Sequence, residues 1–104
     1  MRISGSKRSF AAVVAAFGLA VASPALGFTA CQVTDTGGID DNSFNQTAWK
    51  GVEDAMAEFG VDGRFLESQA ETDYDANINS LIGGQCDVII TVGFLLGDAT
   101  EKAA

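Results

Sequence analysis

Histidine is absent from this 104-residue sequence, which has a single proline, tryptophan and tyrosine and only two cysteines. Without histidine, the most common general base and the imidazole ligands of zinc are missing. The sequence has no Gly-x-Ser-x-Gly elbow and no cysteine beside a base. Gly37-Gly38 does not continue as G-x-G-x-x-G, and there is no P-loop lysine. These absences favour a binding protein over an enzyme and predict no cofactor and no metal.

Basic residues are also scarce, since 6 Lys and Arg face 14 Asp and Glu. Arg2, Lys7 and Arg8 lie at the N-terminus, before the first acidic residue, Asp35. The chain after these three basic residues is strongly acidic, and it is therefore poorly suited to bind nucleic acid or an anionic membrane surface. The acidic residues are scattered, so most of them are expected to form a solvated surface.

The N-terminal region has the three parts of a secretory signal peptide: a basic start, an apolar run over 10–22, and small residues around Pro24. The run is shorter than the roughly 20 apolar residues that span a bilayer. We therefore predict that residues 1–27 are a signal peptide and that the protein is exported. Residues 28–31 also resemble a lipobox, which would make Cys31 a lipid-modified N-terminus.

Cys31 and Cys86 are the only cysteines. An even number of cysteines in an oxidising compartment favours a disulfide. A zinc site is not expected, because there is no histidine and no closely spaced cysteine pair. Lipid attachment to Cys31 and a disulfide are thus the two alternatives.

Residues 28–104 alternate between apolar runs and helical periodicity. Strands are predicted at 28–34, 64–68 and 87–93, and helices at 44–59, at 72–82 and from 98 onward. Ser43 and Gln46 have the spacing of a capping box, and Gly60 is a suitable helix C-cap. The order predicts an α/β fold with a parallel sheet and flanking helices. The last helix stops within its first turns, so we expect an N-terminal piece of a larger protein that does not fold alone.

The loop between the first strand and the first helix concentrates polar groups. In α/β proteins, ligands bind at the carboxyl ends of strands, where helices begin. Asp35, Asp40 and Asp41 lie here but lack the ligand spacing of a calcium loop. Phe44 is either a core residue or a ring that stacks on a ligand. Trp49 lies off the predicted apolar stripe and is expected to face an element outside this chain.

Residues 33–46, VTDTGGIDDNSFNQ, followed by AWKG at 48–51, resemble the signature of the basic membrane protein family. Members of this family are substrate-binding proteins of ABC importers, similar to the bacterial purine nucleoside receptor. The runs at 66–68, 73–74, 77–79 and 86–100 match the same family in order. The resemblance implies a type I periplasmic binding protein, with residues 28–104 as the first half of its N-terminal lobe. It also implies a monomer in the periplasm or at the cell surface that works with an ABC permease.

The resemblance implies roles for individual residues. Phe44 would stack on the nucleoside base, while Asp41 and Asn45 would make polar contacts to the nucleoside. The cleft would further be lined by Asp35, Ser43, Gly93 and Phe94. The sheet order 2-1-3 would place Cys31 near Cys86, which predicts a disulfide between them.

Two other functions remain as alternatives. The first is a ligand-sensing or regulatory surface lipoprotein on the same scaffold. In the family the lipobox lies well before the first strand, whereas Cys31 lies within the strand motif, which does not favour an anchor there. The second is a metal-dependent hydrolase that uses Asp35, Asp40 and Asp41.

Overall fold

Strand β1 (Thr29–Val33) lies in the middle of a three-stranded parallel sheet, between β2 (Asp62–Leu66) and β3 (Val88–Thr91). This arrangement is seen in a computed structural model that describes residues 27–104. Cys31 is paired with Arg64 on one side and with Ile89 on the other. The predicted strand order and the parallel direction are confirmed.

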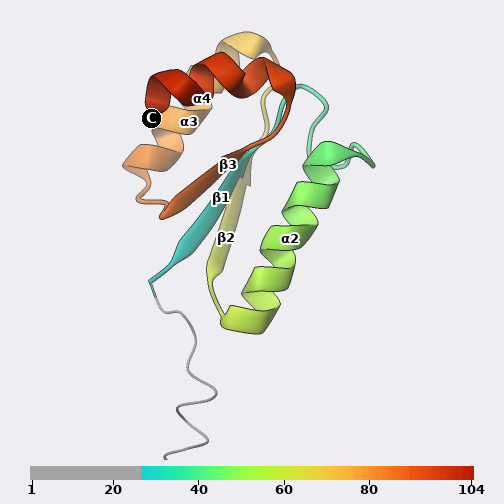
Figure 1. The fold of residues 1–104 in the computed structure, drawn as a ribbon, viewed down its shortest axis with the longest axis vertical. Coiled ribbons are helices and arrows are strands. Elements are labelled where there is room, and N and C mark those ends of the chain that lie inside the picture. Colours follow the sequence, from blue (N-terminus) through green and yellow to red (C-terminus); the bar gives the residue numbers. More distant parts are fainter. Residues whose placement is uncertain (1–26) are drawn as a thin grey trace, which may run out of the picture.

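Helices cover both faces of the sheet (Figure 1). Helix α2 (Phe44–Phe59) lies on one face, and α3 (Tyr74–Gly83) and α4 (Gly97–Ala103) lie on the other. Short 3-10 turns, η1 (Glu71–Asp73) and η2 (Phe94–Leu96), lead into α3 and α4. The predicted β-α-β-α-β-α order is therefore confirmed.

The side chains of β1 alternate between the two faces, as a strand requires. Cys31 and Val33 are fully buried in the main core, where they join residues of α3 and η2. The helical members of this core are Tyr74, Ile78, Leu81 and Leu96. Gln32 alternates to the other face, where its Nε2 donates a hydrogen bond to the main-chain oxygen of Asn45 on α2, at 2.8 Å. The central strand thus joins an apolar core on one face to a polar contact on the other.

The two ends of α2 differ in how well they were predicted. Gly60 ends the helix at φ 72°, in the left-handed conformation expected of a C-cap. The predicted capping box is wrong, because the Ser43 side chain makes no capping hydrogen bond. Asp41 accepts the free N–H groups instead, and Gln46 Oε1 accepts from Asn42 N at 2.9 Å. A carboxylate is the stronger acceptor for the first turn of a helix.

Strand β2 begins two positions earlier than predicted. Asp62-Gly63 reads as a turn signal, yet both residues belong to the strand, where Asp62 is paired with Thr29. The Asp62 N–H donates to the oxygen of Phe28 at 2.9 Å, so pairing with β1 starts as soon as α2 has ended. The turn propensity of Asp-Gly is overridden by this pairing.

Trp49 has a partner within the chain, on β2. Its ring lies edge-on to Phe65 of β2, with ring centroids 4.9 Å apart and planes at 73°. The buried residues of α2 are Asn45 and Val52, while Met56 and Phe59 at its end are exposed. The helix is therefore rotated toward Trp49 relative to the predicted apolar stripe.

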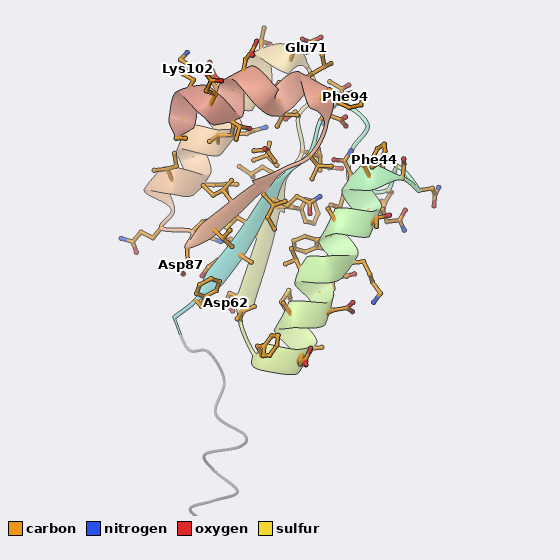
Figure 2. All side chains as sticks on the ribbon, in the orientation of Figure 1. Phe44, Asp62, Glu71, Asp87, Phe94 and Lys102 are labelled. Atoms are coloured by element: carbon orange, nitrogen blue, oxygen red, sulfur yellow. A yellow bond between two sulfur atoms is a disulfide. The ribbon has the colours of Figure 1, made fainter. Side chains whose placement is uncertain are left out.

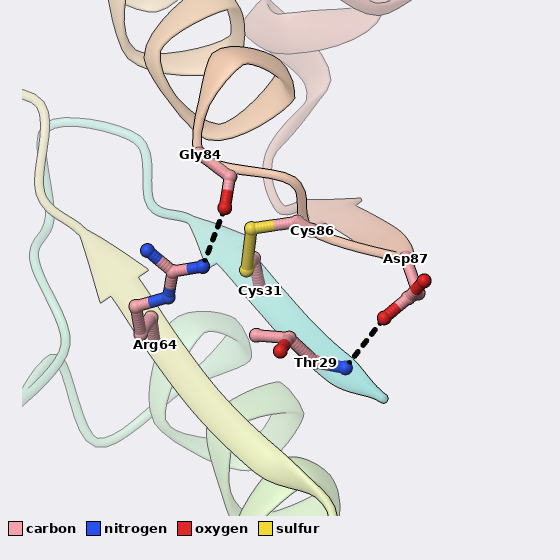
Figure 3. The surroundings of a disulfide bond; sticks show 6 residues. All are labelled: Thr29, Cys31, Arg64, Gly84, Cys86 and Asp87. Atoms are coloured by element: carbon pink, nitrogen blue, oxygen red, sulfur yellow. Dashed lines mark hydrogen bonds between the residues drawn. A yellow bond between two sulfur atoms is a disulfide. The ribbon is translucent and has the colours of Figure 1, made fainter. Parts of the chain in front are cut away.

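Cys31 and Cys86 form a disulfide, with Cα atoms 6.1 Å apart (Figure 3). The predicted pairing is confirmed, and Cys31 has no free sulfur for a lipid. Cleavage before Cys31 would also remove Thr29 and Ala30, which pair with β2 and β3. Hydrogen bonds flank the disulfide, from Arg64 to the Gly84 oxygen at 2.9 Å and from Thr29 N to the Asp87 carboxylate at 2.7 Å. Lipid attachment at Cys31 is incompatible with this arrangement.

The predicted signal peptide lies outside the described residues, apart from Gly27. Within residues 27–104, no helix has the length and apolar character needed to span a membrane.

Candidate ligand-binding site

A hollow of about 510 Å³ opens at the carboxyl ends of β1 and β3. It is lined by Asp35, Phe44, Thr91, Val92, Gly93 and Phe94. The carboxyl end of a parallel sheet is where an α/β fold offers polar groups and helix termini to a ligand. Four of the seven predicted ligand-binding residues, Asp35, Phe44, Gly93 and Phe94, thus come together at one place.

Two aromatic rings lie at the edge of this hollow. Phe44 begins α2 and is 73% exposed, while Phe94 begins η2 and is 97% exposed. Figure 2 shows both at the same end of the molecule, opposite the end marked by Asp62 and Asp87. Phe44 is therefore not a core residue of residues 27–104, and its stacking on a ligand stays a prediction. Exposed rings beside a hollow are suited to stacking on a flat ligand.

Asp35 is the carboxylate of the hollow. Its Oδ1 accepts hydrogen bonds from Gly37 N at 2.9 Å and from Asn45 Nδ2 at 2.7 Å. The first of these closes an Asx turn, and the second ties the loop after β1 to the first turn of α2. The acceptor of the hollow is therefore held by its own loop and by α2.

Asp41 is not among the residues that line the hollow, and it caps α2. Its Oδ1 accepts from Ser43 N at 2.8 Å and Gln46 N at 3.0 Å. Its Oδ2 accepts from Asn45 N at 3.1 Å and Asn45 Nδ2 at 2.9 Å. Loss of water contact raises the pKa of Asp41. The hydrogen bonds from Gln46, Ser43 and Asn45 lower it by more, so that the pKa lies below its ordinary value of 3.8. With four donors in place, the Asp41 carboxylate is occupied by the N-cap and first turn of α2.

The other two predicted contacts lie outside the lining of the hollow. Asn45 is 1% exposed, and Ser43 is exposed at the N-cap of α2. Asn45 Oδ1 has no hydrogen-bond partner among the described residues. The direct nucleoside contacts implied for Asp41, Ser43 and Asn45 stay predictions, while the structure gives Asp41 and Asn45 roles in holding the loop.

Tyr74, for which no site role was predicted, lies close to this loop. It is 3% exposed and belongs to the first turn of α3. Burial raises the pKa of Tyr74, and the nearby charges of Asp35 and Glu71 raise it further, against a smaller opposite effect of Thr36. The proximity of Asp35 to α3 has no signal in the sequence, since it depends on how α3 packs against the sheet.

Thr91 and Val92 also line the hollow but were not predicted as site residues. The signal that could have found them is their position at the end of the third strand, which corresponds to that of Asp35 after the first. Within residues 27–104, no group of three or more His, Cys, Asp or Glu side chains is arranged to hold a metal ion.

Comparisons with known proteins point to one family. Residues 28–104 match the Bmp family model, described as ABC transporter substrate-binding protein PnrA-like. The chain is similar to the CD4+ T-cell-stimulating antigen of Listeria monocytogenes, with 43% identity over 74% of this chain and 23% of the relative. It is also similar to the ABC transporter nucleoside-binding protein BmpA of Lactococcus lactis subsp. cremoris, with 37% identity over 69% of this chain and 22% of the relative. The chain thus spans about a quarter of the length of these curated relatives.

Solved structures agree with this assignment. An ABC transporter solute-binding protein from Aeropyrum pernix K1 superposes with a TM-score of 0.65 and 33% identity, over 72% of this chain and 20% of that one. A fragment from Peptoclostridium difficile 630 has the same fold, with a TM-score of 0.66, 22% identity, and coverage of 74% of this chain and 63% of that one. The chain belongs to the Bmp family of PnrA-like ABC transporter substrate-binding proteins.

Proposed function

We propose that residues 28–104 are part of the N-terminal lobe of an exported substrate-binding protein that binds a purine nucleoside for an ABC importer. The observation that carries this proposal is the 73% exposed ring of Phe44 at the edge of a hollow that also contains Asp35. A nucleoside has a flat base to stack on a ring, and N–H and O–H groups to donate to a carboxylate. Support for this ligand class comes from the BmpA relative, which is described as nucleoside-binding.

The lining divides into stacking and polar parts. The base stacks on Phe44, and Phe94 contacts the ligand from the end of β3. Asp35 accepts a hydrogen bond, and Gly93 leaves room for the Asp35 carboxylate because it has no side chain. The predicted contacts of Ser43, Asp41 and Asn45 belong to the rim and support of the same loop.

The hollow is one side of a cleft. It lies open at the carboxyl end of the sheet, and this chain spans only 23% and 22% of the two curated relatives. A second lobe that closes over Phe44 and Phe94 would bury the two rings, which are largely exposed here. The protein then acts as a monomer that delivers its ligand to a membrane permease.

Export is consistent with the chemistry of the chain. Disulfides persist in oxidising compartments, and Cys31 and Cys86 are paired. We place the protein in the periplasm or at the cell surface. An anchor at Cys31 is excluded by the disulfide, so the lipoprotein alternative would need an attachment site elsewhere.

Isothermal titration calorimetry on the full-length protein tests the ligand class. Inosine, guanosine and adenosine are titrated in parallel with cytidine, uridine and free ribose. We expect saturable binding of at least one purine nucleoside, with weaker binding of the pyrimidines, because larger rings stack more strongly. Failure of every nucleoside to bind would refute the proposal, and binding of free ribose as tightly as inosine would refute the stacking role of Phe44.

A further inference from the structure

Asp35 and Asp41, which both accept from the Asn45 amide, differ in how many of their oxygens already accept hydrogen bonds. Each oxygen of Asp41 accepts hydrogen bonds from two N–H groups of the N-cap and first turn of α2. Asp35 uses Oδ1 for two donors, Gly37 N and Asn45 Nδ2. Its Oδ2 accepts no hydrogen bond from residues 27–104 and belongs to a side chain that lines the hollow. One carboxylate oxygen of the pair therefore remains open to a ligand.

Asn45 connects the two carboxylates through one amide group. Its Nδ2 donates to Asp35 Oδ1 at 2.7 Å and to Asp41 Oδ2 at 2.9 Å. Both N–H bonds of the amide are used, and one planar group fixes the direction of each. The position of Asp35 in the hollow is thus coupled to the cap of α2 by a side chain that is only 1% exposed.

While the Asn45 amide nitrogen makes these two contacts, the amide oxygen makes none. Asn45 Oδ1 is buried and has no partner among the described residues. A buried unpaired acceptor is unfavourable, and rotating the amide by half a turn would aim that oxygen at two carboxylates. An apolar side chain could fill the same space without either problem. The residue is therefore suited to supplying the two N–H donors, and not to packing alone.

We propose that Asn45 is a positioning residue, which acts through Asp35 and keeps Asp35 Oδ2 aimed at a donor group of the bound nucleoside. This inference rests on the proposed function and adds a division of roles to it. Asp35 contacts the ligand, whereas Asn45 and Asp41 hold the loop. Because a carboxylate oxygen such as Asp35 Oδ2 accepts hydrogen bonds, its partner is an N–H of the base or an O–H of the sugar.

Ligand analogues that lack one donor each identify the partner. Calorimetry on the full-length protein compares inosine with 1-methylinosine, which lacks the ring N–H, and with 2′-, 3′- and 5′-deoxyinosine, which each lack one hydroxyl. We expect one analogue to bind about tenfold or more weakly than inosine, because a site built to receive a donor discriminates against its loss. Equal binding of all five probes would overturn the acceptor role of Asp35.

The variants then separate positioning from simple destabilisation. In Asp35→Asn the preference for inosine over the discriminating analogue should fall to about onefold, because the acceptor is replaced. Asn45→Ser, which removes the amide, should give the same loss of preference while Asp35 is intact. Asn79→Leu, on the exposed side of α3, is the control and should keep the wild-type preference. An unchanged preference in Asn45→Ser, with all probes weakened equally, would show a merely structural role and overturn the proposal.

A ligand-free measurement separates this inference from the proposed function. The amide proton of Gly37 reports on Asp35 Oδ1, which accepts its hydrogen bond. Its NMR shift should change in Asn45→Ser and stay in place in Asn79→Leu. If no nucleoside binds the wild type, the proposed function fails, and this shift alone decides the coupling. An unchanged Gly37 amide in Asn45→Ser would then overturn the positioning role.

Discussion

A methyl group on Gly93 would lie 2.6 Å from Oδ2 of Asp35. The residue has φ 117°, a conformation that side-chain-bearing residues rarely adopt. The carboxylate thus occupies the space that a side chain at the end of β3 would need. The position of Asp35 therefore depends on two residues. Asn45 donates a hydrogen bond to its Oδ1, and the absence of a side chain on Gly93 leaves room for its Oδ2.

The first prediction is that Gly93→Ala lowers both stability and nucleoside affinity. The strained backbone should cost about 1–3 kcal/mol of unfolding free energy, and Asp35 must move away from its present position. Urea unfolding and calorimetry on the full-length protein measure the two effects. Gly97→Ala is the matched control, because a Cβ on Gly97 meets nothing within 4 Å. A Gly93→Ala variant with wild-type stability and affinity would contradict the close approach to Asp35.

Much of the fold could be predicted from local patterns. The β-branched run before Gly93 and the apolar run before Asp35 indicate buried strands, and Gly60 marks the end of α2 by its conformation. The family resemblance supplied the sheet order and hence the Cys31–Cys86 pairing, which are both confirmed. Family membership also confirms that the chain is not an enzyme.

The arrangement of the loop could not be predicted in the same way. Asp41 caps α2 because Asn42 adopts φ 54°, which turns the carboxylate back toward the helix. Nothing in the spacing shows that a non-glycine residue takes this conformation. The burial of Asn45 depends on Gln32 of β1, which binds its main-chain oxygen across the layer. Such contacts arise from packing between elements, where sequence periodicity carries no information.

Phe44→Ala should weaken nucleoside binding by about 1–3 kcal/mol, the range found for a ring that stacks on a base. Its effect on stability should be small, because the ring is 73% exposed. Phe59→Ala is the control, since Phe59 is also exposed on α2 but at the opposite end of the helix. Calorimetry with inosine should separate the two variants, and equal affinity losses would refute a stacking role for Phe44.

Asp41→Ala should lower the melting temperature by a few degrees, because four N–H donors lose their acceptor. The neighbouring Asp40→Ala should have little effect, since Asp40 is exposed and makes no hydrogen bond within residues 27–104. Differential scanning calorimetry of both variants makes the comparison. Equal melting temperatures for the wild type and Asp41→Ala would argue that Asp41 is not the cap.

The contribution of Asp41 should also depend on pH in a defined direction. Its pKa in the folded protein is held below the ordinary value of 3.8, so the unfolded chain takes up the proton first as pH falls. The stabilisation is therefore complete above that value and is lost as pH falls through the lower pKa of the folded state. Melting curves should show the gap between the wild type and Asp41→Ala closing below pH 3.8. A gap that widens there would contradict the lowered pKa.

Removing the disulfide should destabilise the protein by about 2–4 kcal/mol, because the bond closes a loop between residues that are 55 positions apart. The Cys31→Ala, Cys86→Ala double variant should show this loss in urea unfolding, and reductant should lower the stability of the wild type alone. Mass spectrometry after alkylation without reduction checks the premise in exported protein. Two alkylated thiols would show that the bond is absent.

The packing of α2 on the sheet gives opposite predictions for two glycines. A Cβ on Gly63 in β2 would lie 2.8 Å from Val52 Cγ1 and 2.5 Å from Met56 Sδ, whereas a Cβ on Gly51 would meet nothing within 4 Å. Met56 can swing away, but Val52 is buried and branched at Cβ, so Gly63→Ala should lose about 1–3 kcal/mol of stability. Gly51 is exposed within α2, where alanine should instead gain about 0.5–1 kcal/mol. Urea unfolding of the two variants should move the midpoint in opposite directions, and a stabilised Gly63→Ala would show that α2 does not approach β2 this closely.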